Sequence, residues 1–385
     1  MSLDEEIQLE LLELERVHRR RFPRTLAGAQ APEVDLDGQR VINFASNDYL
    51  GLAAHPALVQ AAKRSLDENG FGAGASRLVV GNHREHVELE HELGDWMGEG
   101  RHVRLFSSGY AANVGLLSAL LSPGDVVFSD ELNHASIIDG CRLSRASVVV
   151  YPHRDLVALE DSLRQIRQTQ HRGRQLIVTE SLFSMDGDLA DVSGLARLAA
   201  DYNASLMLDE AHAVGILGPT GRGIAASHGV VPDLLVGTLG KAFGAAGAFV
   251  AATPGVVDWL WNRARSFVFS TGLPPSTAAA GRAALEIVRD VSGETLRARL
   301  QENLRTLRIT PALGGAAESP IAPILVNDDQ RVMELSRSWL DSKVFVQGIR
   351  YPTVPMGTAR LRISLSASHS IGQIRQLSEL VRCST

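Results

Sequence analysis

Short apolar runs alternate with helix-forming segments from about residue 57 to residue 280, and this alternation limits the fold more than any other feature. Several runs carry no polar alternation, as expected for strands that are buried on both faces of a mostly parallel sheet. Helix-forming stretches such as HVELEHELGDWMG and LEDSLRQIRQ lie between them. The pattern predicts an α/β fold with a helix-covered sheet. The runs are VRLFSS (103–108), DVVFSD (125–130), SVVVYP (147–152), QLIVTES (175–181), SLMLDEA (205–211), DLLVGT (233–238) and AFVAAT (248–253).

The segments on either side of this region predict further structure. Residues 4–21 carry acids first and arginines last, the order that a helix dipole favours, and we expect a helix that Pro23 ends. RVINFAS (40–46) is typical of a short strand. Residues 281–385 mix helices with the candidate strands APILVN and ARLRISLS and indicate a smaller lobe. We therefore expect three parts: an N-terminal segment (1–50), a large domain (51–280) and a small C-terminal domain (281–385).

Polar residues gather where the apolar runs end. Ligands of open α/β sheets bind outside the carboxyl ends of the strands. The sequence therefore predicts a functional site at that edge of the sheet. The polar run ends are Ser107-Ser108-Gly109, Asp130, Glu180, Asp209 and Thr238.

The overall composition favours an enzyme-sized protein of the cytoplasm. A hydrophobic content of 45%, a charged content of 21% and a net charge of −6 give no reason to expect a nucleic-acid or membrane-surface partner. No apolar run approaches the roughly 20 residues of a membrane span. The start MSLDEEIQLE lacks the basic and apolar regions of a signal peptide. Cys141 and Cys383 are too few and too far apart to predict a disulfide framework or a cysteine metal site.

Lysine is rare in this chain, which directs attention to the three positions that keep it. Only Lys63, Lys241 and Lys343 occur among 38 basic residues, and Lys241 lies in the glycine-rich stretch GTLGKAFG. Arginine is not normally deprotonated in proteins, so it cannot form an imine with an aldehyde, whereas an amine can. The pattern indicates amine chemistry at Lys241. The alternative is a solvated loop lysine, the interpretation that suits Lys63 and Lys343.

Two stretches could hold a phosphate and a ring nitrogen. FSSGYAANVG (106–115) passes from a strand to a helix N-terminus, which suits a phosphate, although many strand-to-helix turns look alike and no Walker A pattern is present. In LMLDEAHAVG (206–215), Asp209 ends a strand and His212 follows three residues later. A buried acid there could face a protonated heterocyclic nitrogen. A capping Asp and a packed His remain alternatives, and a metal site lacks a supporting third ligand.

Two loops complete the candidate site. His134 in NHAS (133–136) could stack on a planar ring, although a plain loop histidine has the same sequence. FSMDG (183–187) is rich in turn formers and offers the hydroxyl of Ser184, but the GxSxG elbow of a serine hydrolase is absent. A phosphate cradle, an acid, a flat histidine and an imine-forming lysine are the parts needed to hold pyridoxal 5′-phosphate (PLP).

The chain resembles the α-oxoamine synthases, a family of fold-type I PLP enzymes. The resemblance covers nearly the whole chain and implies a large domain with a mostly parallel sheet, a smaller α+β C-terminal domain, and a homodimer with shared active sites. The matching motifs are SNDYLGL (46–52), GAGASRLVVGNHREHVELE (72–90), NHASIIDG (133–140), TESLFSMDGD (179–188), LDEAHAVGILGPTGRG (208–223), GTLGKAFG (237–244), FSTGLPP (269–275) and PTVPMGTARLRISLSA (352–367).

The resemblance also implies roles for individual residues. Lys241 would carry PLP as an imine, Asp209 would pair with the pyridinium nitrogen, His212 would contact the phenolic oxygen and His134 would stack on the ring. These four are the expected catalytic residues. Further cofactor contacts would come from Gly109, Tyr110, Ser184 and Thr238, and from Thr271 of the neighbouring subunit. Substrate contacts would come from Arg362, which would hold the amino-acid carboxylate, and from Arg19, Asn47, Ser76, His134 and Thr353.

Within the family, three features favour the branch of biotin biosynthesis, which condenses L-alanine with a pimeloyl thioester of coenzyme A or acyl carrier protein. The chain lacks the N-terminal extension common in mitochondrial aminolevulinate or membrane-associated sphingolipid enzymes. Ser76 stands where the aminolevulinate branch typically has threonine, and PTVPMGTARLR and FSTGLPP are most like the biotin branch. Glycine C-acetyltransferase shares NHASIIDG and GTLGKA and stays an alternative. A non-catalytic PLP-binding protein is a more distant alternative.

Overall fold

The computed structural model of the protein describes residues 1–310 and 313–384, which form two compact units. The large unit consists of Leu52–Ser184 and Leu189–Arg297. The small unit consists of Met1–Gly51, Met185–Asp188 and Ala298–Thr385, so the two ends of the chain belong to one unit. The division into three parts expected from the sequence stays a prediction.

A seven-stranded sheet forms the centre of the large unit, in the order β4-β10-β9-β8-β7-β5-β6. The strands from β9 to β6 run parallel, whereas β10 is antiparallel to both of its neighbours. Each of the seven predicted runs is a strand, and the mostly parallel sheet is confirmed. The strands are β4 (His102–Phe106), β5 (Val126–Asp130), β6 (Ser147–Tyr151), β7 (Gln175–Glu180), β8 (Ser205–Asp209), β9 (Leu234–Thr238) and β10 (Ala248–Ala252).

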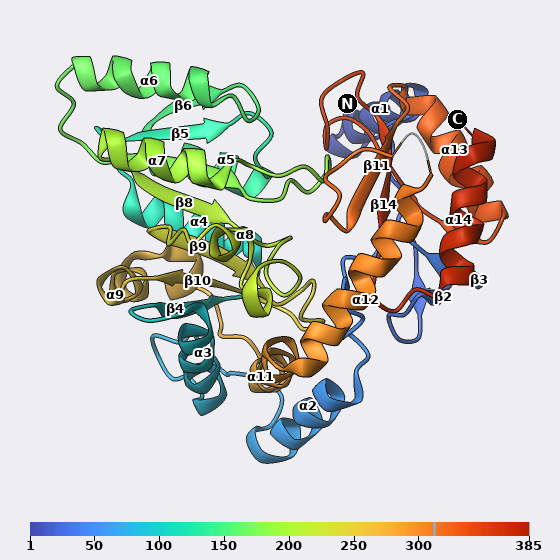
Figure 1. The fold of residues 1–385 in the computed structure, drawn as a ribbon, viewed down its shortest axis with the longest axis horizontal. Helices are drawn as coiled ribbons and strands as arrows, with labels where there is room; N and C mark the ends of the chain where they lie inside the picture. The colour runs from blue at the N-terminus through green and yellow to red at the C-terminus, as the bar shows by residue number, and fades with distance from the viewer. Residues whose placement is uncertain (311–312, 385) are drawn as a thin grey trace. The chain divides into compact units, whose positions relative to one another are not determined.

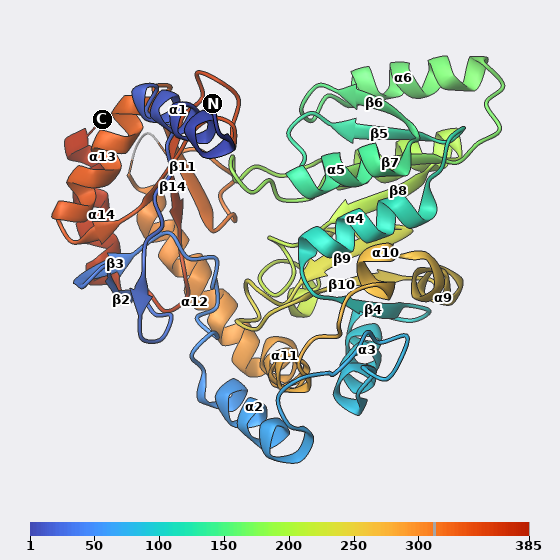
Figure 2. The ribbon, with the colours of Figure 1, turned by 180° about the vertical axis from the view of Figure 1, so that it is seen from behind.

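Helices cover both faces of this sheet. The helices of the large unit, not all of which lie against the sheet, are α2 (Pro56–Asn69), α3 (Arg84–Met97), α4 (Gly109–Leu120), α5 (Ala135–Ser144), α6 (Leu156–Gln168), α7 (Val192–Tyr202), the short η1 (Pro219–Gly221) and α8 (Ile224–Ser227), α9 (Pro254–Arg263), α10 (Arg265–Val268), α11 (Pro275–Arg289) and α12 (Val291–Arg308), which continues into the small unit. Figure 1 shows α6 and α7 in front of the sheet, and Figure 2 shows α4 and α5 on its other side. No helix in the described part of the chain is long and apolar enough to cross a membrane.

Burial on both faces explains why the apolar runs lack polar alternation. Along β5, Val127 packs in a core cluster with residues of α4, α5, α9 and α10. Its neighbours Val126 and Phe128 pack in a second cluster with α6 and α7. Every residue of β5 is buried. A sheet covered on two sides thus needs apolar side chains at successive positions.

The small unit contains two small sheets and three further helices. One sheet has the order β1-β2-β3-β12 and the other β11-β14-β13. The predicted strands RVINFAS, APILVN and ARLRISLS correspond to β3, β11 and β14. The elements are α1 (Leu3–Arg16), β1 (Leu26–Ala27), β2 (Glu33–Leu36), β3 (Gln39–Asn43), β11 (Ile321–Leu325), α13 (Asp329–Asp341), β12 (Val344–Phe345), β13 (Gln347–Ile349), β14 (Arg360–Ser364) and α14 (Ile371–Ser384).

The expected N-terminal helix is present, but its predicted C-terminal end is wrong. Helix α1 begins with a capping box between Ser2 and Glu5 and ends at Arg16, well before Pro23. His18 adopts a left-handed conformation with φ of 58°, which cannot continue a right-handed helix. Arginines 19–21 therefore follow the helix and do not form its last turn.

Candidate active site

The polar residues expected to lie at one edge of the sheet come from neighbouring parallel strands. Asp130 ends β5, Glu180 ends β7, Asp209 ends β8 and Thr238 ends β9. These strands are consecutive in the sheet, so their carboxyl ends share one edge. The edge predicted from the sequence is confirmed, and each residue's role at that edge stays a prediction.

Lys241 follows β9 and contacts a histidine from the loop after β8. Its Nζ lies 2.8 Å from Nε2 of His212, which is 5% exposed. A protonated amine only donates, so the imidazole nitrogen accepts this bond from the ammonium form. The turn after the lysine needs Gly244, which has φ of +63°: a Cβ there would lie 2.3 Å from the backbone nitrogen of Ala53. The glycine therefore sets the path of the chain that presents the amine.

Asp209 is buried and already held by two donors. Its Oδ1 accepts the backbone N–H of Ala211 at 2.9 Å, and its Oδ2 accepts Nδ2 of Asn113 at 2.7 Å. Asn113 lies one turn into α4 and is 1% exposed. Sequence reasoning missed it, although it stands as a polar residue among the small and apolar residues of FSSGYAANVG. Its effect is to fix the orientation of the carboxylate.

The same asparagine connects Asp209 to His134 through a serine. Asn113 Nδ2 also donates to Oγ of Ser136 at 2.9 Å, and Ser136 Oγ lies 2.7 Å from Nδ1 of His134. The backbone N–H of Ser136 donates to that Nδ1 at 3.2 Å, so this nitrogen carries no proton. The Ser136 hydroxyl must then donate to it, and the neutral imidazole holds its proton on Nε2. The network ties the orientation of His134 to that of Asp209.

Glu180 is a fully buried acid next to these groups. Burial, and after it the nearby Asp209 carboxylate, raise the pKa of its carboxyl to about 8, although Lys241 acts in the opposite direction. Its backbone N–H donates to Oδ1 of Asn133 at 3.1 Å, and Asn133 Nδ2 donates to the carbonyl of Val178 at 2.9 Å. Asn133 thereby joins the loop that carries His134 to β7. At neutral pH the Glu180 carboxyl holds its proton.

The helix start predicted to bind phosphate lies at α4. Ser108 caps this helix, and its Oγ accepts the N–H of Ala111 at 3.1 Å. Gly109 and Tyr110 form the first two helical positions, where backbone N–H groups point out of the helix. The Tyr110 hydroxyl donates to the carboxylate of Asp139 on α5. Tyr110 is half exposed, so its ring is open to a ligand.

The other expected cofactor residues lie in the large unit, Thr238 at the end of β9 and the others in loops. The Thr238 hydroxyl donates to the carbonyl of Gly247 at 3.0 Å, and Ser184 is buried. Thr271 is exposed and forms an isolated β-bridge with Ser76, so two residues far apart in the sequence lie together. Their expected contacts with cofactor, substrate or a second subunit stay predictions.

In the small unit, the structure brings Asn47 and Arg362 together. Arg362 is 6% exposed, its Nη2 donates to Oδ1 of Asn47 at 3.1 Å, and its Nη1 donates to Oγ of Ser364 at 2.8 Å. Both contacts are with uncharged groups. These two contacts help to orient the guanidinium, whose fork of N–H donors matches the geometry of a carboxylate.

The other two residues expected to contact substrate have different partners. The Nε of Arg19 donates to Oδ2 of Asp329 at 2.8 Å, and its guanidinium lies 4.7 Å from the centre of the Tyr351 ring. The hydroxyl of Thr353 accepts Nη2 of Arg21 at 2.8 Å. This hydrogen bond to Thr353 comes from Arg21, not from Arg19.

The donors and acceptors at the carboxyl edge fit PLP. Lys241 offers the amine for its aldehyde, Asp209 offers an oriented buried carboxylate for its ring nitrogen, and the start of α4 offers N–H groups for its phosphate. The Oδ1 of Asn113 is buried and has no hydrogen-bond partner among the described residues. A buried acceptor beside an acid is suited to a protonated ligand.

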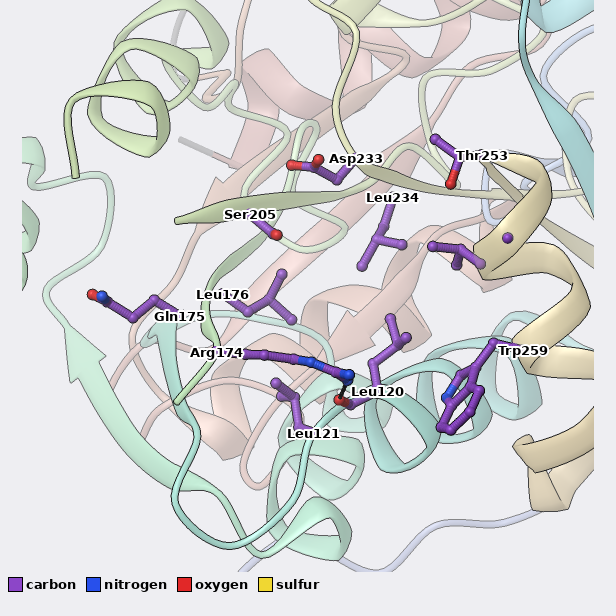
Figure 3. Close-up of a pocket in the computed structure, with 12 residues that line it drawn as sticks. Leu120, Leu121, Arg174, Gln175, Leu176, Ser205, Asp233, Leu234, Thr253 and Trp259 are labelled. Atoms are coloured by element: carbon purple, nitrogen blue, oxygen red, sulfur yellow. Dashed lines mark hydrogen bonds between the residues drawn. The ribbon is translucent and has the colours of Figure 1, made fainter. Parts of the chain in front are cut away.

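A cavity of about 360 Å³ lies at the opposite edge of the same sheet. Leu176, Ser205 and Leu234, at the amino ends of β7, β8 and β9, line it together with Trp259 (Figure 3). The side chain of Arg174 crosses its floor and donates to the carbonyl of Leu120. Ligands of such sheets bind at the carboxyl ends, so we place the active site at the other edge.

Comparison with known sequences agrees with this geometry. Residues 39–381 match the model of the family described as aminotransferase class I and II. A putative 8-amino-7-oxononanoate synthase of Syntrophotalea carbinolica is 49% identical, and the match covers 93% of each chain. The 8-amino-7-oxononanoate synthase of Geobacter metallireducens is 46% identical over 94% of this chain and 93% of that protein.

Solved structures extend the similarity to the fold. A serine palmitoyltransferase of S. paucimobilis with a bound PLP–myriocin aldimine superposes with a TM-score of 0.93 at 28% identity and covers 100% of this chain and 98% of that one. An 8-amino-7-oxononanoate synthase of Francisella tularensis has a TM-score of 0.75 at 32% identity and covers 89% of this chain and 96% of that one. The chain belongs to the aminotransferase class I and II family, and within it to the group whose members are 8-amino-7-oxononanoate synthases.

Proposed function

We propose that the protein is a PLP-dependent acyltransferase that condenses L-alanine with a pimeloyl thioester to give 8-amino-7-oxononanoate, carbon dioxide and a free thiol in biotin biosynthesis. The contact between Lys241 and His212, next to an oriented Asp209, carries the chemical part of this proposal. The relatives at 46–49% identity support the choice of reaction. We further expect the enzyme to work in the cytoplasm.

Bound PLP supplies an electron sink that stabilises negative charge at the Cα of the amino acid. Lys241 would hold the cofactor through its amine, and its Nζ would take the proton from Cα. The bond between Cα and the thioester carbonyl carbon then forms as the thiol leaves. The carboxylate departs as carbon dioxide, and a proton returns to Cα. His212 is placed to hold Lys241 Nζ in position for both proton transfers.

The surrounding residues orient the reactants. Asp209 would pair with the ring nitrogen of the cofactor and favour its protonated form, and Asn113 holds Asp209 in place. His134 presents a flat imidazole whose tautomer is set by Ser136. Arg362 binds the alanine carboxylate before its loss, since its planar fork of donors matches a carboxylate and contacts with Asn47 and Ser364 help to orient it.

A homodimer completes this proposal. Thr271 is exposed and lies beside Phe269, a large apolar residue that is 72% exposed. An exposed aromatic next to an expected phosphate ligand is consistent with Thr271 reaching the cofactor of a second copy of the chain. Gly109, Tyr110, Ser184 and Thr238 would bind the cofactor within one chain. Asn47, Ser76, Arg19 and Thr353 would line the substrate pocket.

A matrix of substrates tests the function directly. Glycine, alanine and serine are each combined with acetyl, succinyl, pimeloyl and palmitoyl thioesters, and carbon dioxide and free thiol are measured. Alanine with pimeloyl thioester should exceed the other pairs by at least roughly tenfold in kcat/KM, about 1.4 kcal/mol of transition-state binding. If glycine with acetyl thioester is preferred, the protein is a glycine C-acetyltransferase. Absence of turnover with every pair would favour a non-catalytic PLP-binding protein.

A further inference from the structure

The small unit contains a cavity of about 650 Å³ whose lining is rich in arginine. It is formed by the segment that follows α1, by α13 and by the chain from β12 through β13 to Thr353. Among the lining residues that the structure describes, Asp37 is the one acid. The basic residues are Arg20, Arg21, Arg24, Arg337 and Arg350.

Arg350 is buried without a partner that matches its charge. It is 5% exposed, its Nη2 donates to the carbonyl of Arg20 at 2.7 Å, and its Nη1 lies 2.9 Å from the sulfur of Met333. Its Nε is buried and has no hydrogen-bond partner among the described residues. A thioether is a weak acceptor and a carbonyl is neutral, so these contacts leave the positive charge uncompensated.

A second buried arginine of the same unit shows the usual arrangement. Arg360 is 3% exposed and forms an ion pair with Asp186. Among the described residues, no carboxylate lies within ion-pair distance of Arg350. Burial lowers the pKa of Arg350, repulsion from Arg21 lowers it further, and the more distant Asp329 opposes both. Asp329 is itself engaged with Arg19.

The other basic residues divide into neutralised and open ones. Arg24 pairs with Asp37, and Arg20 pairs with Glu15. Arg21 instead donates to the uncharged hydroxyl of Thr353. Arg337 of α13 is exposed and also has no carboxylate of the described residues within ion-pair distance. Positive charge therefore remains at Arg21, Arg337 and Arg350, of which Arg350 is the buried one. A buried cation is costly unless an anion accompanies it, which indicates that the missing partner is a ligand.

We propose that this cavity is an oxyanion site, in which Arg350 and Arg21 bind a carboxylate or phosphate group of the acyl thioester substrate. The identity of the ligand rests on the proposed function, whereas the charge of the site does not. Two sources have this chemistry: the free carboxyl at the far end of a pimeloyl chain and a phosphate of its carrier. A guanidinium binds either one through paired N–H donors. Arg19, which we expected to meet the acyl end, is already paired with Asp329.

Binding measured without turnover tests the site first. Pimelate, heptanoate and inorganic phosphate are titrated calorimetrically into the full-length holoenzyme. Wild type should bind pimelate or phosphate, and Arg350→Gln should weaken that binding at least roughly tenfold, about 1.4 kcal/mol. Arg350→Lys should restore part of it. Arg305→Gln is the matched control, because Arg305 is an exposed arginine of α12 paired with Glu302. Failure of wild type to bind either oxyanion overturns the proposal.

Because Arg350 is buried, its replacement could lower stability, so thermal unfolding is measured for every variant. Arg21→Gln changes an exposed position of the same cavity and tests the site independently of folding. It should weaken oxyanion binding severalfold. Unchanged affinity in both the Arg350→Gln and Arg21→Gln variants contradicts the assignment.

Steady-state kinetics then identify the source of the oxyanion. The substrates are pimeloyl-coenzyme A, heptanoyl-coenzyme A, which lacks the distal carboxyl, and pimeloyl-N-acetylcysteamine, which lacks the carrier phosphates. A rise in KM in Arg350→Gln for the two pimeloyl thioesters alone assigns the site to the acyl carboxylate. A rise for the two coenzyme A thioesters alone assigns it to a phosphate, and kcat should change little in either case. Unchanged KM for all three overturns the link to the substrate. If wild type does not turn over pimeloyl thioesters, the proposed function fails, and the calorimetry still decides whether the site exists.

Discussion

The carboxyl edge of the large-unit sheet and the arginine cavity of the small unit both bury ionisable groups, but their charges have opposite sign. At the sheet edge, the buried acids Asp209 and Glu180 lie near a single amine, Lys241. In the cavity, Arg350 is buried with no carboxylate of the described chain beside it. The first environment suits a protonated heterocycle and the second an anion. A buried charged group whose hydrogen bonds are with neutral groups, such as Asp209 or Arg350, thus indicates a ligand of the opposite charge.

The largest expected effect tests the amine at the sheet edge. Lys241→Ala should reduce turnover at least about a thousandfold, because the cofactor's covalent attachment and the proton acceptor are both removed. The protein should also lose its yellow colour on dialysis. Lys63→Ala, at an exposed position of α2, is the control. Borohydride should fix PLP on Lys241 in wild type, and labelling that maps to Lys63 or Lys343 would contradict the assignment.

The next prediction concerns Asp209, the buried carboxylate of the sheet edge. Asp209→Asn keeps the size of the side chain but removes the negative charge, so the ring nitrogen is no longer held protonated. Turnover should fall about a hundredfold while PLP is retained, as measured by absorbance and by release of carbon dioxide. Asp201→Asn, on the surface of α7, should behave as wild type. Near-normal turnover in Asp209→Asn would make this residue purely structural.

A smaller effect is expected from the residue that positions Asp209. Asn113→Ala removes the donor to the carboxylate and to Ser136, so kcat should fall about tenfold through loss of orientation. The free energy of unfolding should decrease by about 1–3 kcal/mol because a buried acceptor loses its partner. Ser136→Ala separates the two contacts, since it leaves Asp209 in place and frees only His134. If Asn113→Ala lowers stability without changing kcat, Asn113 has no positioning role.

The smallest expected effect concerns Glu180, the acid that holds its proton at the carboxyl edge of the sheet. The pKa of Glu180 is raised from 4.5 to about 8, so between these pH values the folded protein holds a proton that the unfolded chain releases. Its contribution to stability is complete below about pH 4.5 and is lost as the pH rises to about 8.

Glu180→Gln cannot titrate, so its unfolding free energy should fall less steeply with pH than that of wild type. The difference in slope is at most about 1.4 kcal/mol per pH unit, measured by urea unfolding between pH 5 and 8. Glu210, whose pKa burial raises to about 7, adds the same slope to both proteins. Glu286→Gln, at an exposed position of α11, is the control. Equal slopes in wild type and Glu180→Gln would mean that Glu180 is ionised in the folded state.

Features predicted from the sequence were those that depend on local pattern. The seven apolar runs are strands, and such runs are visible without coordinates. Inner strands such as β5 are buried because covered sheets need successive apolar residues, whereas the edge strand β6 is mostly exposed. The end of α1 was placed five residues too late, because the left-handed turn at His18 leaves no clear signal in a run of basic residues. Asn113 was missed for a related reason: its partners Asp209 and Ser136 are distant in sequence, and only packing brings them together.

The sequence by itself determined the class of fold, the edge of the sheet at which polar residues gather, and the family, because these follow from apolar periodicity and from motifs that are continuous in the chain. Tertiary structure alone decided which groups share a hydrogen bond or a buried charge. It paired Lys241 with His212, joined Asp209 to His134 through Asn113 and engaged Arg19 with Asp329. Within the described part of the chain, it placed no carboxylate at ion-pair distance from Arg350 and left its Nε without a hydrogen bond. The physical reason is that the free energy of a charge depends on its burial and on the partners within a few ångströms, and both are set by segments that lie far apart in the sequence.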